Sequence, residues 1–117
     1  MLHIYNSVIH NNDGHGIYCW SSQILVTLHN SIVSDNGGYG VSSTLSTDKN
    51  WNTASNNCWY NNTSGACSPY ISLGIPPGYG NITEDPMFHS TQSGGEDFRL
   101  KPGSPCKDLA MGYRDGF

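Results

Sequence analysis

A phrase of twelve residues occurs three times in this chain, and the repetition limits the folds that are open to it. The copies are NSVIHNNDGHGI at residues 6–17, NSIVSDNGGYGV at residues 30–41 and NNCWYNNTSGAC at residues 56–67. They start 24 and 26 residues apart. Self-similarity at a period of about 20–50 residues indicates a solenoid or a related array, in which each repeat buries its apolar face only against its neighbours.

The residue types inside the repeat favour strands over helices. Short segments with Val, Ile and Tyr are bounded by Asn and Gly, and apolar residues do not recur at the three- and four-residue spacing of a helix. We therefore predict an all-β right-handed parallel β-helix of about four coils, as a single domain over residues 1–117. Residues 1–69 would form three repeat coils, residues 70–81 a protruding Pro/Gly loop, and residues 82–117 a terminal coil and cap.

Aligning the three copies predicts which residues lie above one another, about 4.8 Å apart. We expect two inward-facing columns, one of Val8, Ile32 and Cys58 and one of Ile17, Val41 and Cys67. Two Asn ladders are expected, one of Asn6, Asn30 and Asn56 and one of Asn12, Asn36 and Asn62. Three outward columns should lie on a water-accessible wall: Tyr5, His29 and Ser55; His10, Ser34 and Tyr60; and Asn11, Asp35 and Asn61. The repeat glycines would supply the positive φ of the corners. Trp59 would point outward, because its neighbour Cys58 is expected to point inward.

The end of the chain carries a different pattern, DPMF…DFRLKPGSPCKDLAMG, within residues 85–112. It resembles the last coil of secreted bacterial parallel β-helix proteins in the broad pectate-lyase-like superfamily, matching at Asp85, Pro86, Phe88, Asp97, Phe98, Leu100, Gly103, Ser104, Pro105, Asp108 and Gly112. The resemblance implies an extracellular or cell-surface protein with a closing coil, whose last inward layer holds Phe88, Phe98 and Leu100. That superfamily includes lyases, hydrolases and proteins of unknown role, so the resemblance implies a fold more than a function.

The beginning of the sequence enters the first repeat at once, since Asn6 lies five residues after Met1. We expect an exposed apolar rim that includes Leu2 and Ile4. Two interpretations follow, a fragment of a longer β-helix or a homo-oligomer that forms through the first coil. The opening residues lack the basic start and long apolar core of a signal peptide, so the sequence by itself does not assign a cellular compartment.

The charge and the cysteine content limit the classes of partner and cofactor that this chain can bind. The net charge is −4 with only five Lys and Arg residues, which argues against nucleic acid and anionic membranes as partners. We expect no zinc, because the four cysteines form no CxxC motif, and no other cofactor, with calcium as an alternative that no motif supports. Cys58, Cys67 and Cys106 are expected to act as small buried hydrophobes, with a disulfide as the alternative.

Two classes of function remain. A polysaccharide hydrolase or lyase would use carboxylates on the solenoid wall, with Asp13, Asp35 and His10 as the catalytic candidates, because Asp13 and Asp35 occupy neighbouring turn positions in consecutive coils. The alternative is that these are turn residues that bond their own backbone.

The low charge and the absence of a dense catalytic cluster favour a second class, a non-catalytic carbohydrate-associated or surface-interaction module. Outward aromatic and imidazole rings could stack on a glycan, with Tyr5, His29, Tyr60 and Trp59 as the candidate ligand-binding residues. Trp59 could instead be covered by the loop of residues 70–80, and the whole domain could be structural, with no ligand.

Overall fold

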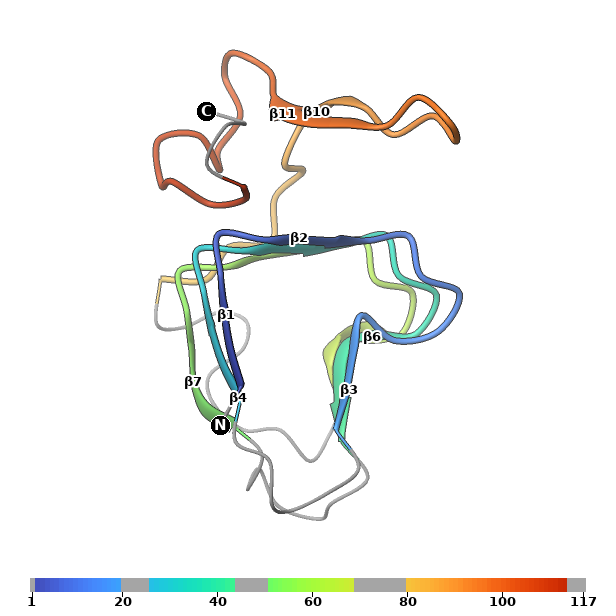
Figure 1. Ribbon diagram of the computed structural model, residues 1–117, viewed down its shortest axis with the longest axis vertical. Helices are drawn as coiled ribbons and strands as arrows, with labels where there is room; N and C mark the ends of the chain where they lie inside the picture. The colour runs from blue at the N-terminus through green and yellow to red at the C-terminus, as the bar shows by residue number, and fades with distance from the viewer. Residues whose placement is uncertain (1, 20–25, 44–50, 69–79, 114–117) are drawn as a thin grey trace.

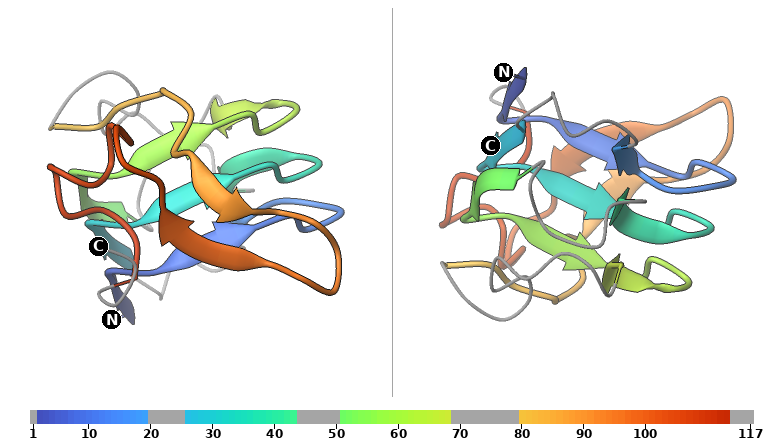
Figure 2. Two further views of the ribbon diagram at one scale, coloured as in Figure 1. Left: turned by 90° about the horizontal axis from the view of Figure 1, so that it is seen from above. Right: turned by 90° about the horizontal axis from the view of Figure 1, so that it is seen from below.

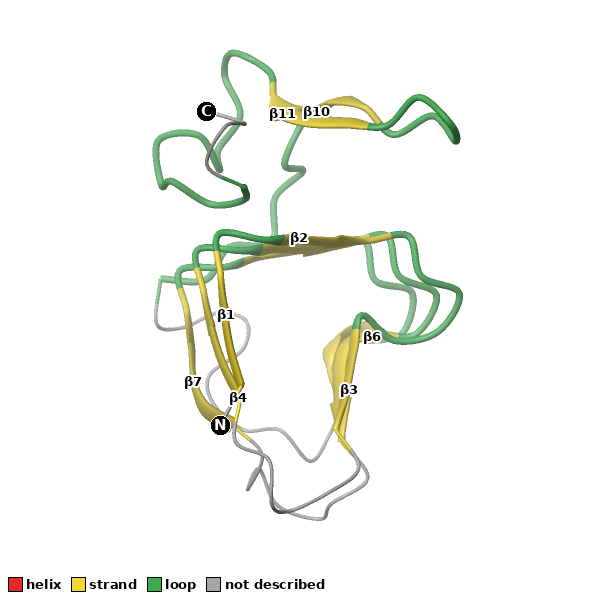
Figure 3. Cartoon of the chain, in the orientation of Figure 1, coloured by secondary structure: helices red, strands yellow, loops and turns green. Residues whose placement is uncertain are grey.

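The computed structural model describes residues 2–19, 26–43, 51–68 and 80–113, and these residues form strands and turns (Figure 3). The strands in chain order are β1 (Leu2–Tyr5), β2 (Val8–His10), β3 (Ile17–Cys19), β4 (Val26–His29), β5 (Ile32–Ser34), β6 (Tyr39–Ser43), β7 (Trp51–Ser55), β8 (Cys58–Tyr60), β9 (Gly65–Cys67), β10 (Phe88–Ser90) and β11 (Asp97–Leu100).

The first nine strands form three parallel sheets, with the strand orders β1-β4-β7, β2-β5-β8 and β3-β6-β9. Each sheet takes one strand from each repeat, so the three repeats stack as successive coils (Figure 1). The register pairs Val8 with Ile32 and Ile32 with Cys58, as predicted from the sequence. The parallel solenoid is therefore confirmed. Among the described residues, a fourth coil is represented by the segment around Asn81 and Ile82. It bonds to the third coil through the Cys58–Ile82 bridge and the hydrogen bond from Asn57 N to Asn81 Oδ1, but its described residues add no strand to the three sheets. The predicted number of coils is therefore not confirmed.

Two sharp corners of each coil are made by Asn or Asp, and among the repeat glycines Gly65 alone has a positive φ, which corrects the expectation above. Two corner columns have φ between 49° and 60°, namely Asn6, Asn30, Asn56 and Asn11, Asp35, Asn61. Asn and Asp tolerate this left-handed conformation better than other residues with a side chain. In the first column the side chain of Asn56 donates to Asn30 at 2.6 Å, so the corner also bonds along the stack.

A second Asn ladder lies on the inner side of the turn that follows β2, β5 and β8. The fully buried Asn36 accepts at Oδ1 from the backbone and side-chain nitrogens of Asn12, at 3.0 and 2.9 Å. Its Nδ2 donates to Asn62 Oδ1 at 2.8 Å and to the Ile9 carbonyl at 3.4 Å. One amide therefore links three coils, as predicted.

Two of the repeat glycines, Gly16 and Gly40, are needed because of close packing. A Cβ added to Gly40 would lie 2.7 Å from the Ala66 carbonyl oxygen, 3.0 Å from the Trp59 ring and 3.1 Å from Asn62 Nδ2. A Cβ added to Gly16 would lie 2.6 Å from the Gly40 carbonyl oxygen. A side chain at either position would therefore push apart adjacent coils.

Gly40→Ala is expected to lower the free energy of unfolding by about 2 kcal/mol, the usual cost of overpacking. Gly14→Ala is the matched control, since nothing lies within 4 Å of its added Cβ and its φ is not positive. That control should be neutral or stabilise the chain by up to about 1 kcal/mol. Urea denaturation followed by circular dichroism measures both, and equal effects would contradict the stacking of Gly40 on Ala66.

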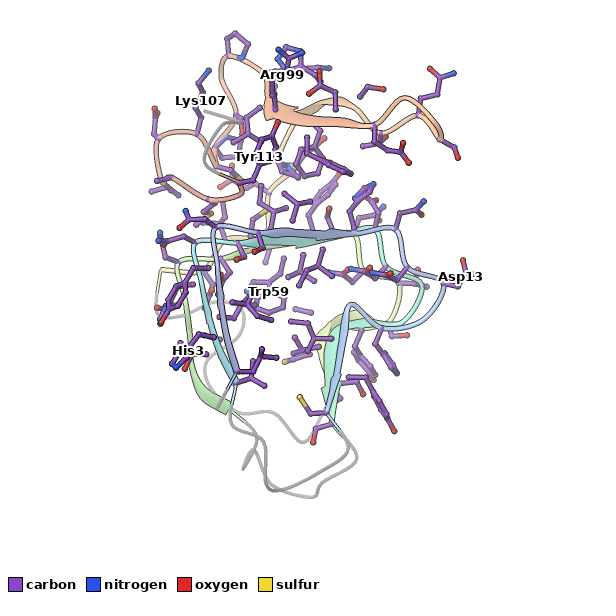
Figure 4. All side chains as sticks on the ribbon, viewed as in Figure 1. His3, Asp13, Trp59, Arg99, Lys107 and Tyr113 are labelled. Atoms are coloured by element: carbon purple, nitrogen blue, oxygen red, sulfur yellow. The ribbon has the colours of Figure 1, made fainter. Side chains whose placement is uncertain are left out.

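The interior of the solenoid contains one of the two predicted inward columns, Ile17, Val41 and Cys67. In the middle sheet it contains instead Val33 and Trp59, the neighbours of Ile32 and Cys58. Val33, Val41 and Trp59 pack inside with Leu28 and other residues of the three sheets. Trp59 is only 3% exposed and lies between the sheets (Figure 4), so the prediction that it points outward is wrong. Its Nε1 donates to Asn81 Oδ1 at 3.2 Å.

Ile32 and Cys58 face the other side of sheet β2-β5-β8, where the C-terminal segment covers them. They form a second cluster with Phe88, Leu100, Cys106 and Met111. The middle sheet is therefore buried on both faces, as parallel sheets usually are.

The covering segment is an antiparallel hairpin, β10-β11, followed by a turn-rich stretch, and together we call residues 85–113 the cap. Figures 1 and 2 show it lying across the outer face of β2-β5-β8. The expected closing coil is thus replaced by a hairpin packed on the side of the stack. The cap also bonds the Asn6 corner column: Gly112 N donates to the Asn30 carbonyl at 2.8 Å, and Asn56 Nδ2 to the Leu109 carbonyl at 3.1 Å.

The cap changes the exposure of the predicted wall. Ser34 is fully buried, and the His10 ring packs edge-on against Phe88 and Phe98, with ring centroids 5.7 and 5.3 Å apart. This part of the wall is therefore closed to water, contrary to the expectation. At the first coil, Leu2 is 47% exposed and Ile4 is partly buried against the core. Association through that rim stays a prediction.

Candidate functional site

A crevice of about 410 Å³ opens where the cap meets the corner that follows β5 and β8. Its walls combine carboxylate, amide, hydroxyl, amine and aromatic groups, from Asp35, Tyr60, Asn61, Asp85, Pro86, Met87, Phe88, Thr91 and Lys101. The solenoid supplies one wall and the cap supplies the other. The crevice is therefore formed only when the cap is packed on the stack.

Asp35 is the acidic member of a corner column that otherwise contains Asn. It follows β5 in the left-handed conformation, with φ 56°, so its side chain leaves the sheet at the rim of the crevice. Its Oδ1 accepts from Asn61 Nδ2 at 2.5 Å, and its Oδ2 lies 3.4 Å from His10 Nδ1. The Asp35 side chain is 32% exposed, so the carboxylate is positioned by its neighbours and still reaches solvent.

His10 lies behind Asp35 rather than in the open crevice. Its side chain is 6% exposed, and Nδ1 is also 2.9 Å from Ser34 Oγ. With the two Phe rings of the cap against it, the imidazole is held on several sides. It is placed to orient the Asp35 carboxylate.

The second carboxylate of the crevice is Asp85, which begins the DPMF segment. Its Oδ1 accepts from Met87 N at 2.8 Å, which stabilises the left-handed turn at Met87. Lys101 N in turn donates to the Met87 carbonyl at 2.9 Å, and Ser104 Oγ to the Pro86 carbonyl at 2.6 Å. These bonds fix Asp85 and Lys101 on the same wall.

A separate charge pair lies on β11, outside the crevice lining. The Arg99 guanidinium donates hydrogen bonds to the Asp97 carboxylate, with Nη2 to Oδ2 at 2.6 Å. These bonds hold the pKa of Asp97 at about 2. Neither group lines the crevice, and the Asp97 side chain is 29% exposed and the Arg99 side chain 60% exposed, so we assign them no role there.

Three of the predicted site residues meet here. Asp35 and Tyr60 both line the crevice, and His10 lies against Asp35. Asp13 does not join them: its carbonyl stacks over Gly37, and its side chain points away at the far turn (Figure 4). The expected Asp13–Asp35 proximity is therefore replaced by Asp35 and Asp85 in one crevice.

The other predicted ligand residues are separated. Tyr5 and His29 stack with ring centroids 5.5 Å apart, and His3 stacks on Tyr5 at 5.9 Å, forming a ring ladder on sheet β1-β4-β7. Trp59 is in the core, as described above. Residues 70–79 of the loop expected to cover it lie outside the described residues.

Sequence reasoning missed Asp85, Thr91 and Lys101. The signal for Asp85 was present in DPMF, a segment interpreted as purely structural. For Asp13, the repeat offset of 24 residues itself aligns it with Gly37 rather than with Asp35.

The described residues contain neither a metal-binding cluster nor a membrane-spanning helix. In ranges 2–19, 26–43, 51–68 and 80–113, no group of three or more His, Cys, Asp or Glu side chains could hold a metal ion. The same part of the chain contains no helix that is long and apolar enough to cross a membrane.

Comparison with known proteins agrees with the architecture. The model of the family described as "Right handed beta helix region" matches residues 2–72, more than half of the chain. No curated protein and no solved structure gives a significant match. The matched segment covers the three stacked coils, whereas the cap lies beyond it. The chain therefore belongs to the right-handed β-helix family.

Proposed function

We propose that this β-helix is a non-catalytic carbohydrate-binding module that holds a glycan in the crevice between the coils and the cap. The observation that carries the proposal is the lining itself: Asp35, Asn61, Asp85 and Lys101 surround the same space as the Tyr60 ring. Carboxylate and amide oxygens accept hydrogen bonds from sugar hydroxyls, amines and amides donate to them, and an aromatic ring packs on a sugar's C–H face. Pockets with an apolar side and a few fixed polar groups are typical ligand sites.

The charge of the crevice favours a neutral glycan. Two carboxylates and one lysine amine line it, and the whole chain has a net charge of −4. A uronic acid polymer would place its carboxylates near Asp35 and Asp85, and like charges at short range repel. We therefore expect neutral hexose or pentose oligosaccharides to bind and galacturonic acid oligomers not to bind.

Asp35→Asn is the sharpest test, because the substitution converts this corner to the residue found in the coils above and below. The fold should tolerate it, with the free energy of unfolding changed by no more than about 0.5 kcal/mol. Binding should fall at least about tenfold, because a hydrogen bond to a charged acceptor is replaced by a weaker one. Titration calorimetry with a panel of neutral tetrasaccharides and tetragalacturonate measures both the affinity and the preference.

The matched control is Asp13→Asn, which removes an exposed carboxylate from the far turn. It should bind as the unaltered chain does. Equal losses for the two variants, or unchanged affinity in Asp35→Asn, would contradict binding in the crevice.

A hydrolase is the second candidate, favoured by one specific contact. The 3.4 Å separation of His10 Nδ1 and Asp35 Oδ2 gives Asp35 a buried partner, and Asp85 supplies a second carboxylate in the same crevice. Sugar hydrolysis commonly uses two carboxylates that flank the bond to be cut. Release of reducing ends from a bound tetrasaccharide, lost in Asp35→Asn and kept in Asp13→Asn, would favour the enzyme. Binding without release favours the module.

A further inference from the structure

Two cysteines from distant parts of the sequence meet under the cap. Cys58 lies in β8 and Cys106 in the turn-rich stretch of the cap, 48 residues apart along the chain. Both are fully buried in the cluster that joins the cap to sheet β2-β5-β8. The Cys106 side chain raises the pKa of the Cys58 thiol, an effect that requires the two side chains to be neighbours. The Cys58 thiol itself donates to the Glu84 carbonyl at 3.1 Å.

The backbone on each side holds these thiols in place. Cys58 N donates to the Ser31 carbonyl at 2.9 Å, and Cys58 also bridges to Ile82. Cys106 N donates to Ser104 Oγ at 3.1 Å, and its carbonyl accepts from Met111 N at 3.0 Å. The contact is therefore between two fixed segments, the third coil and the cap.

The other two cysteines are placed differently. Cys19 belongs to the core inside the coils, and Cys67 is packed against that same core. All four cysteines are reduced in this structure. Cys58 and Cys106 thus form a pair distinct from Cys19 and Cys67 in both location and packing.

We propose that Cys58 and Cys106 are a disulfide-forming pair that locks the cap onto the solenoid. The oxidant is a small-molecule disulfide such as oxidised glutathione. One protein thiolate attacks it to give a mixed disulfide and release one glutathione thiolate, and the second protein thiolate then displaces the other glutathione. The glutathione S–S bond breaks, the Cys58–Cys106 bond forms, and the two protons of the protein thiols end on the two glutathione thiols.

Burial decides when this exchange can occur. The neighbouring Cys106 side chain and the burial of the site raise the pKa of the Cys58 thiol well above its usual range. Only thiolates attack disulfides, and no oxidant reaches a fully buried sulfur. The bond therefore forms while the cap is detached, during folding or transient opening, and once formed it is protected from reductants by the closed cap.

The experiment is refolding of the full chain from denaturant in a glutathione redox buffer, followed by peptide mapping without reduction. The map should show Cys58 joined to Cys106 as the main disulfide. The oxidised chain should unfold at a temperature at least about 10 °C higher than the reduced chain, because the bond constrains a long loop in the unfolded state. The mapping needs no variant, so the result does not depend on a mutant that folds.

Two variants serve as controls. Cys19→Ser combined with Cys67→Ser should keep both the mapped bond and the temperature shift, whereas Cys106→Ala should lose both. Four free thiols after equilibration, or a dominant bond between any other pair, would overturn the proposal. The outcome is independent of whether the crevice binds a glycan.

Discussion

Replacing Trp59 with alanine is expected to lower the free energy of unfolding by about 4 kcal/mol, the usual cost of removing a large buried aromatic side chain. The ring lies inside the coils, packed with Val33, Val41 and Leu28, and its Nε1 donates to Asn81. The substitution therefore opens a cavity and leaves the buried Asn81 side chain with one partner fewer. Urea denaturation monitored by circular dichroism gives the change.

Tyr18→Ala is the control for this substitution. Tyr18 is also an aromatic residue of a solenoid strand, but it is 52% exposed and stacks on His15 at 5.6 Å. Its removal should cost less than about 1 kcal/mol, as is usual for surface positions. Similar losses for Trp59 and Tyr18 would mean that Trp59 is not in the interior.

Asn36→Ala is expected to lower the free energy of unfolding by about 3 kcal/mol. The side chain is fully buried, accepts two hydrogen bonds from Asn12 and donates to Asn62 and to the Ile9 carbonyl. Alanine leaves several of these groups without their partner inside the turn, and each unsatisfied buried group costs about 1–3 kcal/mol. The same denaturation assay measures the loss.

Asn12→Ala is the matched control, because Asn12 has the same residue type in the same ladder at its exposed end. Its side chain donates to Asn36 Oδ1, which keeps its bond from the Asn12 backbone nitrogen. A loss below about 1 kcal/mol is expected. If Asn12 and Asn36 proved equally important, the ladder would not be the source of the stability.

The stacking could be predicted from the sequence because the repeat keeps its register. Once Asn6 is aligned with Asn30, every pair along β2 and β5 follows, and the structure has those pairs. The direction of the side chains could not be obtained in the same way. Ile32 and Val33 are both apolar, so β5 lacks the alternation that marks a solvent face. The solenoid core buries Val33 on one side of the strand, and the cap buries Ile32 on the other.

The candidate site was predictable only where it depends on the repeat. His10 and Tyr60 lie on β2 and β8, and Asp35 directly follows β5, the strand between them, so the alignment brings the three together. Asp85 reaches the crevice because the cap folds back across the stack, a long-range packing that no local pattern encodes. The role of the glycines was also hidden, since the close approach of Gly40 to Ala66 depends on the distance between coils.

The most direct test of glycan binding in the crevice is a nitrogen–proton correlation NMR spectrum of the chain, recorded during titration with each tetrasaccharide of the panel. A neutral tetrasaccharide should shift the backbone amides of Asp35, Asn61, Asp85 and Lys101, and leave those of Asp13 and Gly14 in place. Shifts confined to the Tyr5–His29 ring ladder, or no shift with any member of the panel, would contradict the account.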